Sequence, residues 1–103
     1  MELYDIYIAF VSWGNEGKRR PILFLEASGE KVKAFKITTK YDSKSEKVKK
    51  KYFVINDWRQ AGLSKLSYID ISHIIAVPLP AVEINPIGRL TEADEERFIK
   101  FLS

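Results

Sequence analysis

The chain has 103 residues, of which 46% are hydrophobic and 13% aromatic, and its formal net charge is +3 at pH 7. This length fits one domain, residues 1–103, and the apolar content predicts a folded core rather than a disordered chain. The lack of cysteine excludes disulfides and thiolate metal sites, and a single histidine excludes a histidine cluster within one chain. The mild positive charge permits a polyanionic partner but does not require one.

The N-terminal segment predicts a half-buried strand. Tyr4, Ile6, Ile8 and Phe10 are apolar at alternate positions, which is the period of a strand. No basic stretch precedes the segment and Asp5 interrupts it, so we expect neither a signal peptide nor a membrane span. The expected compartment is the cytoplasm.

The next segments predict a loop followed by two paired strands. Residues 12–20 contain two glycines and three consecutive cations, which is typical of a loop. Residues 21–25 are apolar throughout, which predicts a central strand with Pro21 at its first position. A turn at 28–30 then makes 31–40 the antiparallel return strand.

The return strand has one apolar and one polar face. Phe35 and Ile37 fall on the first, and Lys36, Thr38 and Lys40 on the second. The polar, lysine-rich stretch that follows, residues 41–51, predicts a mobile loop.

The second half of the chain predicts two more strands and a terminal helix. The strands are expected over residues 52–55 and 68–77, with a helical turn at 57–61 between them and a bend near His73, which is expected to be structural. Thr91 is expected to cap the last helix. Phe98, Phe101 and Leu102 share the face that docks on the barrel, and Trp58 is expected in the core or in a dimer interface. Many short strands with a terminal helix favour a mainly β fold, a small antiparallel SH3-like barrel with short helices and a C-terminal helix.

Several of these segments carry a family likeness in the right order along the chain. They are Asp5-Ile6, Arg20-Pro21 followed by residues 22–25, the run 36–40 with its two threonines, and 87–91 before an acidic helix. The chain resembles the MazF/PemK family, the endoribonuclease toxins of type II toxin–antitoxin systems. It departs from the family at Tyr4, where glycine is usual, and in the loop 14–19, so the RNA sequence that would be cut does not follow from the resemblance.

The resemblance implies metal-independent cleavage of single-stranded RNA by its own 2′-hydroxyl, without a cofactor. It also implies a homodimer, for which the terminal helix around Phe98 and Phe101 and the segment near Trp58 are expected contributors. A cognate antitoxin would hold the toxin inactive. Arg20 matches the catalytic arginine and Thr38 the catalytic threonine.

A guanidinium donates paired hydrogen bonds to phosphate oxygens but is a poor base, which suits Arg20 to stabilising an anionic transition state. The base is not visible in the sequence. The expected RNA-binding residues are Trp13, Lys18, Arg19, Lys36 and Lys40. Trp13 either stacks on a base or packs over the barrel end, and the lysines of 41–51 either guide RNA or protect an edge strand.

Two other functions stay open. The same barrel without turnover would be a binding module for RNA or for a protein, and an inactive homologue would act only as an interaction partner. An arginine and a threonine that converge on one groove would favour the enzyme.

Overall fold

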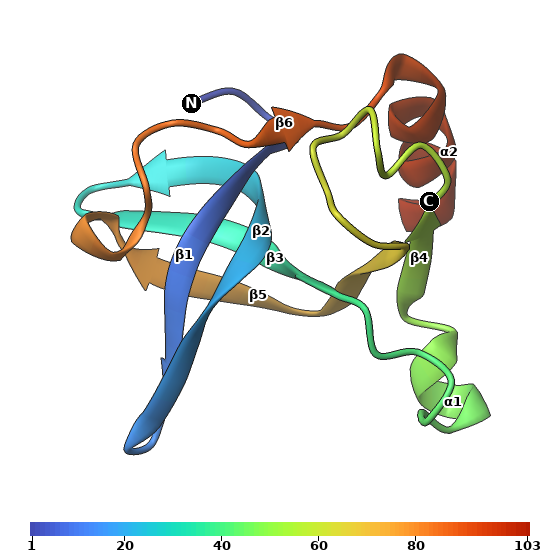
Figure 1. Ribbon diagram of the computed structural model, residues 1–103, viewed down its shortest axis with the longest axis horizontal. Helices are drawn as coiled ribbons and strands as arrows, with labels where there is room; N and C mark the ends of the chain where they lie inside the picture. The colour runs from blue at the N-terminus through green and yellow to red at the C-terminus, as the bar shows by residue number, and fades with distance from the viewer.

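Six antiparallel strands form one curled sheet in the computed structural model, which describes residues 1–103 apart from the side chain of Trp13 (Figure 1). The strands are β1 (Asp5–Trp13), β2 (Glu16–Ser28), β3 (Lys31–Thr38), β4 (Tyr52–Ile55), β5 (Ser67–Pro78) and β6 (Gly88–Arg89). The helices are α1 (Glu46–Lys49), the 3-10 helix η1 (Leu79–Ala81) and α2 (Glu92–Leu102). The order across the sheet is β4-β5-β3-β2-β1-β6. The sheet curls into a half-barrel, so the predicted mainly β, antiparallel barrel-like fold with short helices and a C-terminal helix is confirmed.

The stretch 12–20 forms the end of a long hairpin, and the prediction of a loop there is wrong. β1 pairs with β2 along this whole stretch, so only Gly14 and Asn15 form the turn. Gly14 has a φ of +57°, the left-handed conformation that two-residue hairpin turns commonly use. Arg20 therefore lies inside a strand, and Pro21 is in the middle of β2 rather than at its start.

Both faces of β2 are buried at its centre, which confirms residues 21–25 as a central strand. Leu23 faces a core that we call the helix-side core, while Ile22 and Phe24 face a second core. The helix-side core consists of Tyr4, Ile6, Leu23, Phe35, Ile37, Phe53, Ile55, Ala61, Leu63, Ile69, Leu90 and Phe98. The second core consists of Tyr7, Ala9, Ile22, Phe24, Val32, Ala34, Val77 and Val82.

β1 passes from one core to the other, so the buried residues along it do not all belong to the same alternating face of the strand. Tyr4 and Ile6 are buried in the helix-side core, as expected, but Phe10 is 49% exposed. Tyr7 and Ala9, from the opposite set, are buried in the second core. The curl of the sheet changes which face of β1 is covered along its length.

α2 closes the helix-side core. Thr91 caps the helix as predicted, since its Oγ1 accepts a hydrogen bond of 3.3 Å from the Asp94 N–H. Phe98 is 0% exposed and makes edge-on contacts with the rings of three other core aromatics. Phe101 is half-buried against the same core, but Leu102 is 43% exposed. Phe98 is therefore unavailable to a dimer interface, which corrects its expected contribution there.

A network of polar groups joins α2 to the turn that follows β4. Asp94, which is 1% exposed, accepts hydrogen bonds of 2.7 Å from the Asp57 N–H and of 2.6 Å from Arg97. The Thr91 hydroxyl donates to the Asp57 carboxylate at 2.7 Å. These bonds hold the segment around Trp58 against the helix, and Trp58 itself packs on the helix-side core.

The remaining segments differ in part from expectation. His73 is exposed on β5, so its expected structural role is wrong. The stretch 41–51 is not wholly a loop, because it contains α1, whose first turn is capped by Ser45. The turn at 57–61 makes one helical bond, from the Ala61 N–H to the Asp57 carbonyl. No helix among the described residues is long and apolar enough to cross a membrane.

Candidate active site

The candidate site lies where strands β2 and β3 part. Their pairing ends at Ile22 and Lys36, and beyond this point β3 pairs only with β5. The Ile8 carbonyl bonds to the Glu83 N–H, so Ile8 directs its peptide groups away from its β2 partner, Pro21. Pro21 therefore turns its nitrogen toward β3, where proline has no hydrogen to donate. The ladder stops at this residue and leaves a gap between the strands.

A pocket of about 230 Å³ occupies this gap. Its lining residues are Lys18, Arg19, Arg20, Pro21, Ile37, Thr38, Thr39, Lys40 and Ser67. The structure thus brings together Arg20 and Thr38, the two predicted catalytic residues, from neighbouring strands. Among the described residues of the lining there are four cations and no carboxylate. This composition suits a phosphate group.

Arg20 and Thr38 both present polar groups to the pocket. Arg20 is half-buried, and its Nε atom is shielded from solvent. The Thr38 Oγ1 accepts a hydrogen bond of 3.1 Å from the Lys40 N–H, which orients the hydroxyl and leaves its proton to be donated. Ser67 adds a second hydroxyl, but this one is 3% exposed and donates to the Lys65 carbonyl at 2.8 Å.

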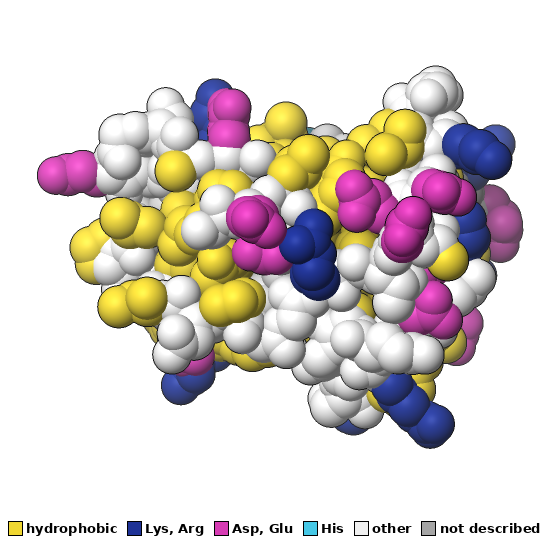
Figure 2. All heavy atoms as spheres, turned by 90° about the horizontal axis from the view of Figure 1, so that it is seen from above, with side chains coloured by type: hydrophobic (Ala, Val, Ile, Leu, Met, Phe, Trp, Pro, Cys, Tyr) yellow, Lys and Arg dark blue, Asp and Glu magenta, His cyan; other side chains and the backbone are white. Residues whose placement is uncertain are grey.

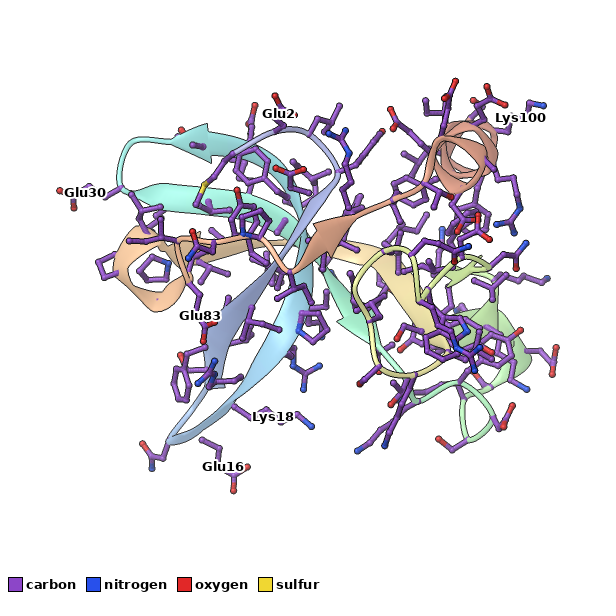
Figure 3. The ribbon with its side chains drawn as sticks, turned by 45° about the horizontal axis from the view of Figure 1, so that its top comes forward. Glu2, Glu16, Lys18, Glu30, Glu83 and Lys100 are labelled. Carbon is purple, nitrogen blue, oxygen red and sulfur yellow. The ribbon has the colours of Figure 1, made fainter. Side chains whose placement is uncertain are left out.

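The predicted RNA-binding cations differ in their surroundings. Lys18 is exposed, and Figure 3 shows it extending from β2 on the side opposite to Glu83. Arg19 forms an ion pair with Glu83, although both side chains remain largely exposed. The positive charge of Arg19 is therefore partly compensated by Glu83, which weakens the expectation that Arg19 binds RNA as Lys18 does.

Lys36 and Lys40, the other two predicted cations, are placed differently. Lys40 lines the pocket, whereas Lys36, two residues before Thr38 on β3, does not line it. Lys36 lies between Ile22 of β2 and Asp70 of β5 in the sheet. The predicted role of Trp13 concerns a side chain outside the described residues.

An aromatic cluster beside the pocket was not predicted. The rings of Tyr41 and Tyr68 are stacked, with centroids 4.3 Å apart and planes within 9°, and Tyr52 lies 6.3 Å from Tyr41. The Lys49 ammonium lies over the Tyr41 ring at 5.0 Å, so one residue of the lysine-rich stretch is tied to this cluster. The three tyrosines come from separate segments, and no short motif in the sequence indicates that they meet.

Other parts of the described structure are less suited to a polyanionic ligand. A larger hollow of about 710 Å³ runs along α2, but Glu92, Glu95 and Glu96 line it, and their charges would repel phosphate. No three side chains of the metal-binding types His, Asp and Glu gather among the described residues. The cationic pocket is thus the better candidate for a polyanionic ligand.

Comparison with known proteins adds no further constraint on the site. No protein-family model matches this chain, and no curated protein sequence matches it.

Proposed function

We propose that this protein is a metal-independent endoribonuclease toxin that cleaves single-stranded RNA and acts in the cytoplasm, as the resemblance to the MazF/PemK family implies. The observation that carries the proposal is the meeting of Arg20 and Thr38 in one cationic pocket. These residues lie 18 positions apart in the sequence, and the β2–β3 hairpin brings them to opposite sides of one pocket. Their convergence is the feature that separates the enzyme from a general basic surface.

The proposed chemistry needs stabilisation of negative charge and two proton transfers, one from the 2′-hydroxyl and one to the leaving 5′-oxygen. The RNA supplies its own nucleophile, the 2′-hydroxyl, which attacks the adjacent phosphorus and expels the 5′-oxygen of the next nucleotide. The Arg20 guanidinium would stabilise the negative charge that develops on the phosphate oxygens. The Thr38 hydroxyl would donate to one of these oxygens, and Lys18 and Lys40 would hold the flanking backbone.

The partners in this proposal are a second copy of the chain and an antitoxin. Exposed apolar side chains support association, and Figure 2 shows hydrophobic atoms gathered over the N-terminus and the segment between η1 and β6. Leu3, Ile84 and Ile87 are among these exposed residues. An acidic antitoxin segment that folds on binding would cover the cationic pocket and block RNA.

The direct test is incubation with a long mixed-sequence RNA in the presence of EDTA. The proposal expects fragments that carry 5′-hydroxyl and cyclic phosphate ends, and expects their loss in Arg20→Ala. Lys31→Ala is the control and should cleave normally, because Lys31 is exposed at the turn end of the β2–β3 hairpin, away from the pocket. Uncut RNA, or cutting that needs added magnesium, would contradict the proposal.

One observation favours a second candidate function, an RNA-binding module without turnover. The described lining of the pocket offers no histidine or carboxylate to serve as the base. The same experiment separates the two, since the module would retain RNA in a binding assay and release no fragments.

A further inference from the structure

The tyrosine cluster lies on the same face of the sheet as the proposed catalytic residues. Thr38 of β3 pairs directly with Tyr68 of β5. Ile22 of β2 pairs with Lys36 of β3. Continuing this antiparallel register by two residues places Arg20 opposite Thr38, on the same face as that pair. Tyr68 and Thr38 are therefore direct neighbours on paired strands, and Arg20 lies across the pocket from Thr38 on the same face.

The remaining tyrosines extend this arrangement away from the pocket. Tyr52 pairs with Asp70, the residue two positions from Tyr68 on β5, and so lies diagonally across from it on the same face. Tyr41 follows Lys40 after the end of β3, and its ring stacks on Tyr68. All three rings are half-buried, which leaves part of each ring exposed.

A lysine side chain occupies the place on the tyrosine cluster where a nucleobase would stack. The Lys49 ammonium lies over the Tyr41 ring and 3.6 Å from the Glu46 carboxylate, and its side chain is 21% exposed. A base that stacks on the same face of the Tyr41 ring would take the place of the ammonium. The displaced ammonium would then be free to pair with a phosphate of the same strand.

The hydroxyls of Tyr52 and Tyr68 also remain neutral under physiological conditions. Burial is the largest cause that raises the pKa of Tyr68 above 10.0, and the charge of Asp42 raises it further, so its hydroxyl stays protonated. Burial followed by Asp70 raises the pKa of Tyr52 in the same way. A phenolate would repel RNA, and these surroundings further disfavour its formation.

We infer that Tyr41, Tyr52 and Tyr68 form a nucleobase-stacking subsite that holds a nucleotide next to the scissile phosphate, with Lys49 moving from the Tyr41 ring to the RNA backbone. This inference rests on the proposed function, because it takes single-stranded RNA as the ligand. It assigns the cluster a role in positioning substrate rather than in the reaction itself. Base stacking on aromatic rings tolerates different bases, so the subsite would strengthen binding more than it would select a sequence.

The test measures binding of a fluorescent, mixed-sequence 2′-O-methyl oligonucleotide, which lacks the nucleophile and cannot be cut, by anisotropy. An abasic backbone of the same length is the second probe. Tyr41→Leu is expected to weaken binding of the base-bearing strand about 5- to 100-fold, the equivalent of one base stacked on one ring. Tyr41→Phe, which keeps the ring, should bind as the wild type does, and both variants should bind the abasic strand equally.

A second measurement on the wild-type protein covers the case in which Tyr41→Leu does not fold. Photocrosslinking of a 5-iodouridine-substituted 2′-O-methyl strand, mapped by mass spectrometry, should reach Tyr41, Tyr52 or Tyr68. Crosslinks found only elsewhere, or equal binding by wild type and a folded Tyr41→Leu, would overturn the inference. Neither assay involves cleavage, so an inactive protein with an intact subsite and an active enzyme without one give different results.

Discussion

The proposed role of Arg20 is best tested by Arg20→Lys, which keeps the positive charge but removes the planar fork. Lysine supplies a point charge, so the pocket remains cationic and RNA should bind within about 3-fold of the wild-type affinity. Removal of a transition-state donor typically costs about 10²–10³ in rate, or about 2.7–4 kcal/mol. Single-turnover cleavage at saturating RNA should fall by this factor.

Thr38→Val supplies the second arm of this test, because valine has nearly the shape of threonine without its hydroxyl. Arg20 and Thr38 line one pocket of about 230 Å³, so they are close enough to act on the same phosphate group. Residues that act on one group are not additive, and the double variant should lose less than the product of the two single losses. Wild-type cleavage by Arg20→Lys, or fully multiplicative losses, would refute the assignment of both residues to one phosphate.

Three other predictions concern binding and stability. The double variant Lys18→Ala/Lys40→Ala should weaken RNA binding and reduce the slope of log K against log salt by about one unit for each phosphate that is no longer neutralised. Glu83→Gln, which releases Arg19 from its ion pair, should instead increase the affinity for RNA. Unchanged salt slopes in the double variant would contradict this assignment. Phe98→Ala should lower the free energy of unfolding by about 3–5 kcal/mol in a denaturant titration, since its ring is fully buried, while Leu102→Ala on the same helix should cost less than about 1 kcal/mol. Burial raises the pKa of Tyr4 and Tyr7 as well as those of Tyr52 and Tyr68, so their stabilising effect is complete below pH 10.0 and is lost as the pH rises through the folded-state values; a stability that stays constant above pH 10.0 would contradict these shifts.

The two faces of the return strand were predictable because they depend on a local alternation. Phe35 and Ile37 are buried in the helix-side core, while Thr38 and Lys40 line the pocket. The cap at Thr91 is likewise a short-range pattern, since a threonine before an acidic first turn satisfies the helix N-terminus wherever the helix docks. Such features survive folding because no distant segment competes with them.

The errors fell where strand pairing decides the outcome. The glycines and adjacent cations of 12–20 indicated a loop, but the stretch forms the end of the β1–β2 hairpin, where Trp13 pairs with Glu16. His73 has apolar neighbours in sequence, yet four residues of β5, from 71 to 74, lie opposite a single residue of β3. This bulge turns His73 outward. The stacking of Tyr41 on Tyr68 depends on two segments far apart in sequence and was equally beyond local patterns.

The origin of the pocket connects the fold to the proposed chemistry. Pro21 ends the β2–β3 ladder because it has no N–H, and the parting strands leave Arg20 and Thr38 facing one space. A continuous ladder would bring these side chains within one strand spacing and leave no room for a phosphate between them. A residue with a backbone N–H at position 21 would restore the missing donor. The proline next to the arginine therefore does more than hold it in an extended conformation, since it also opens the site that the arginine serves.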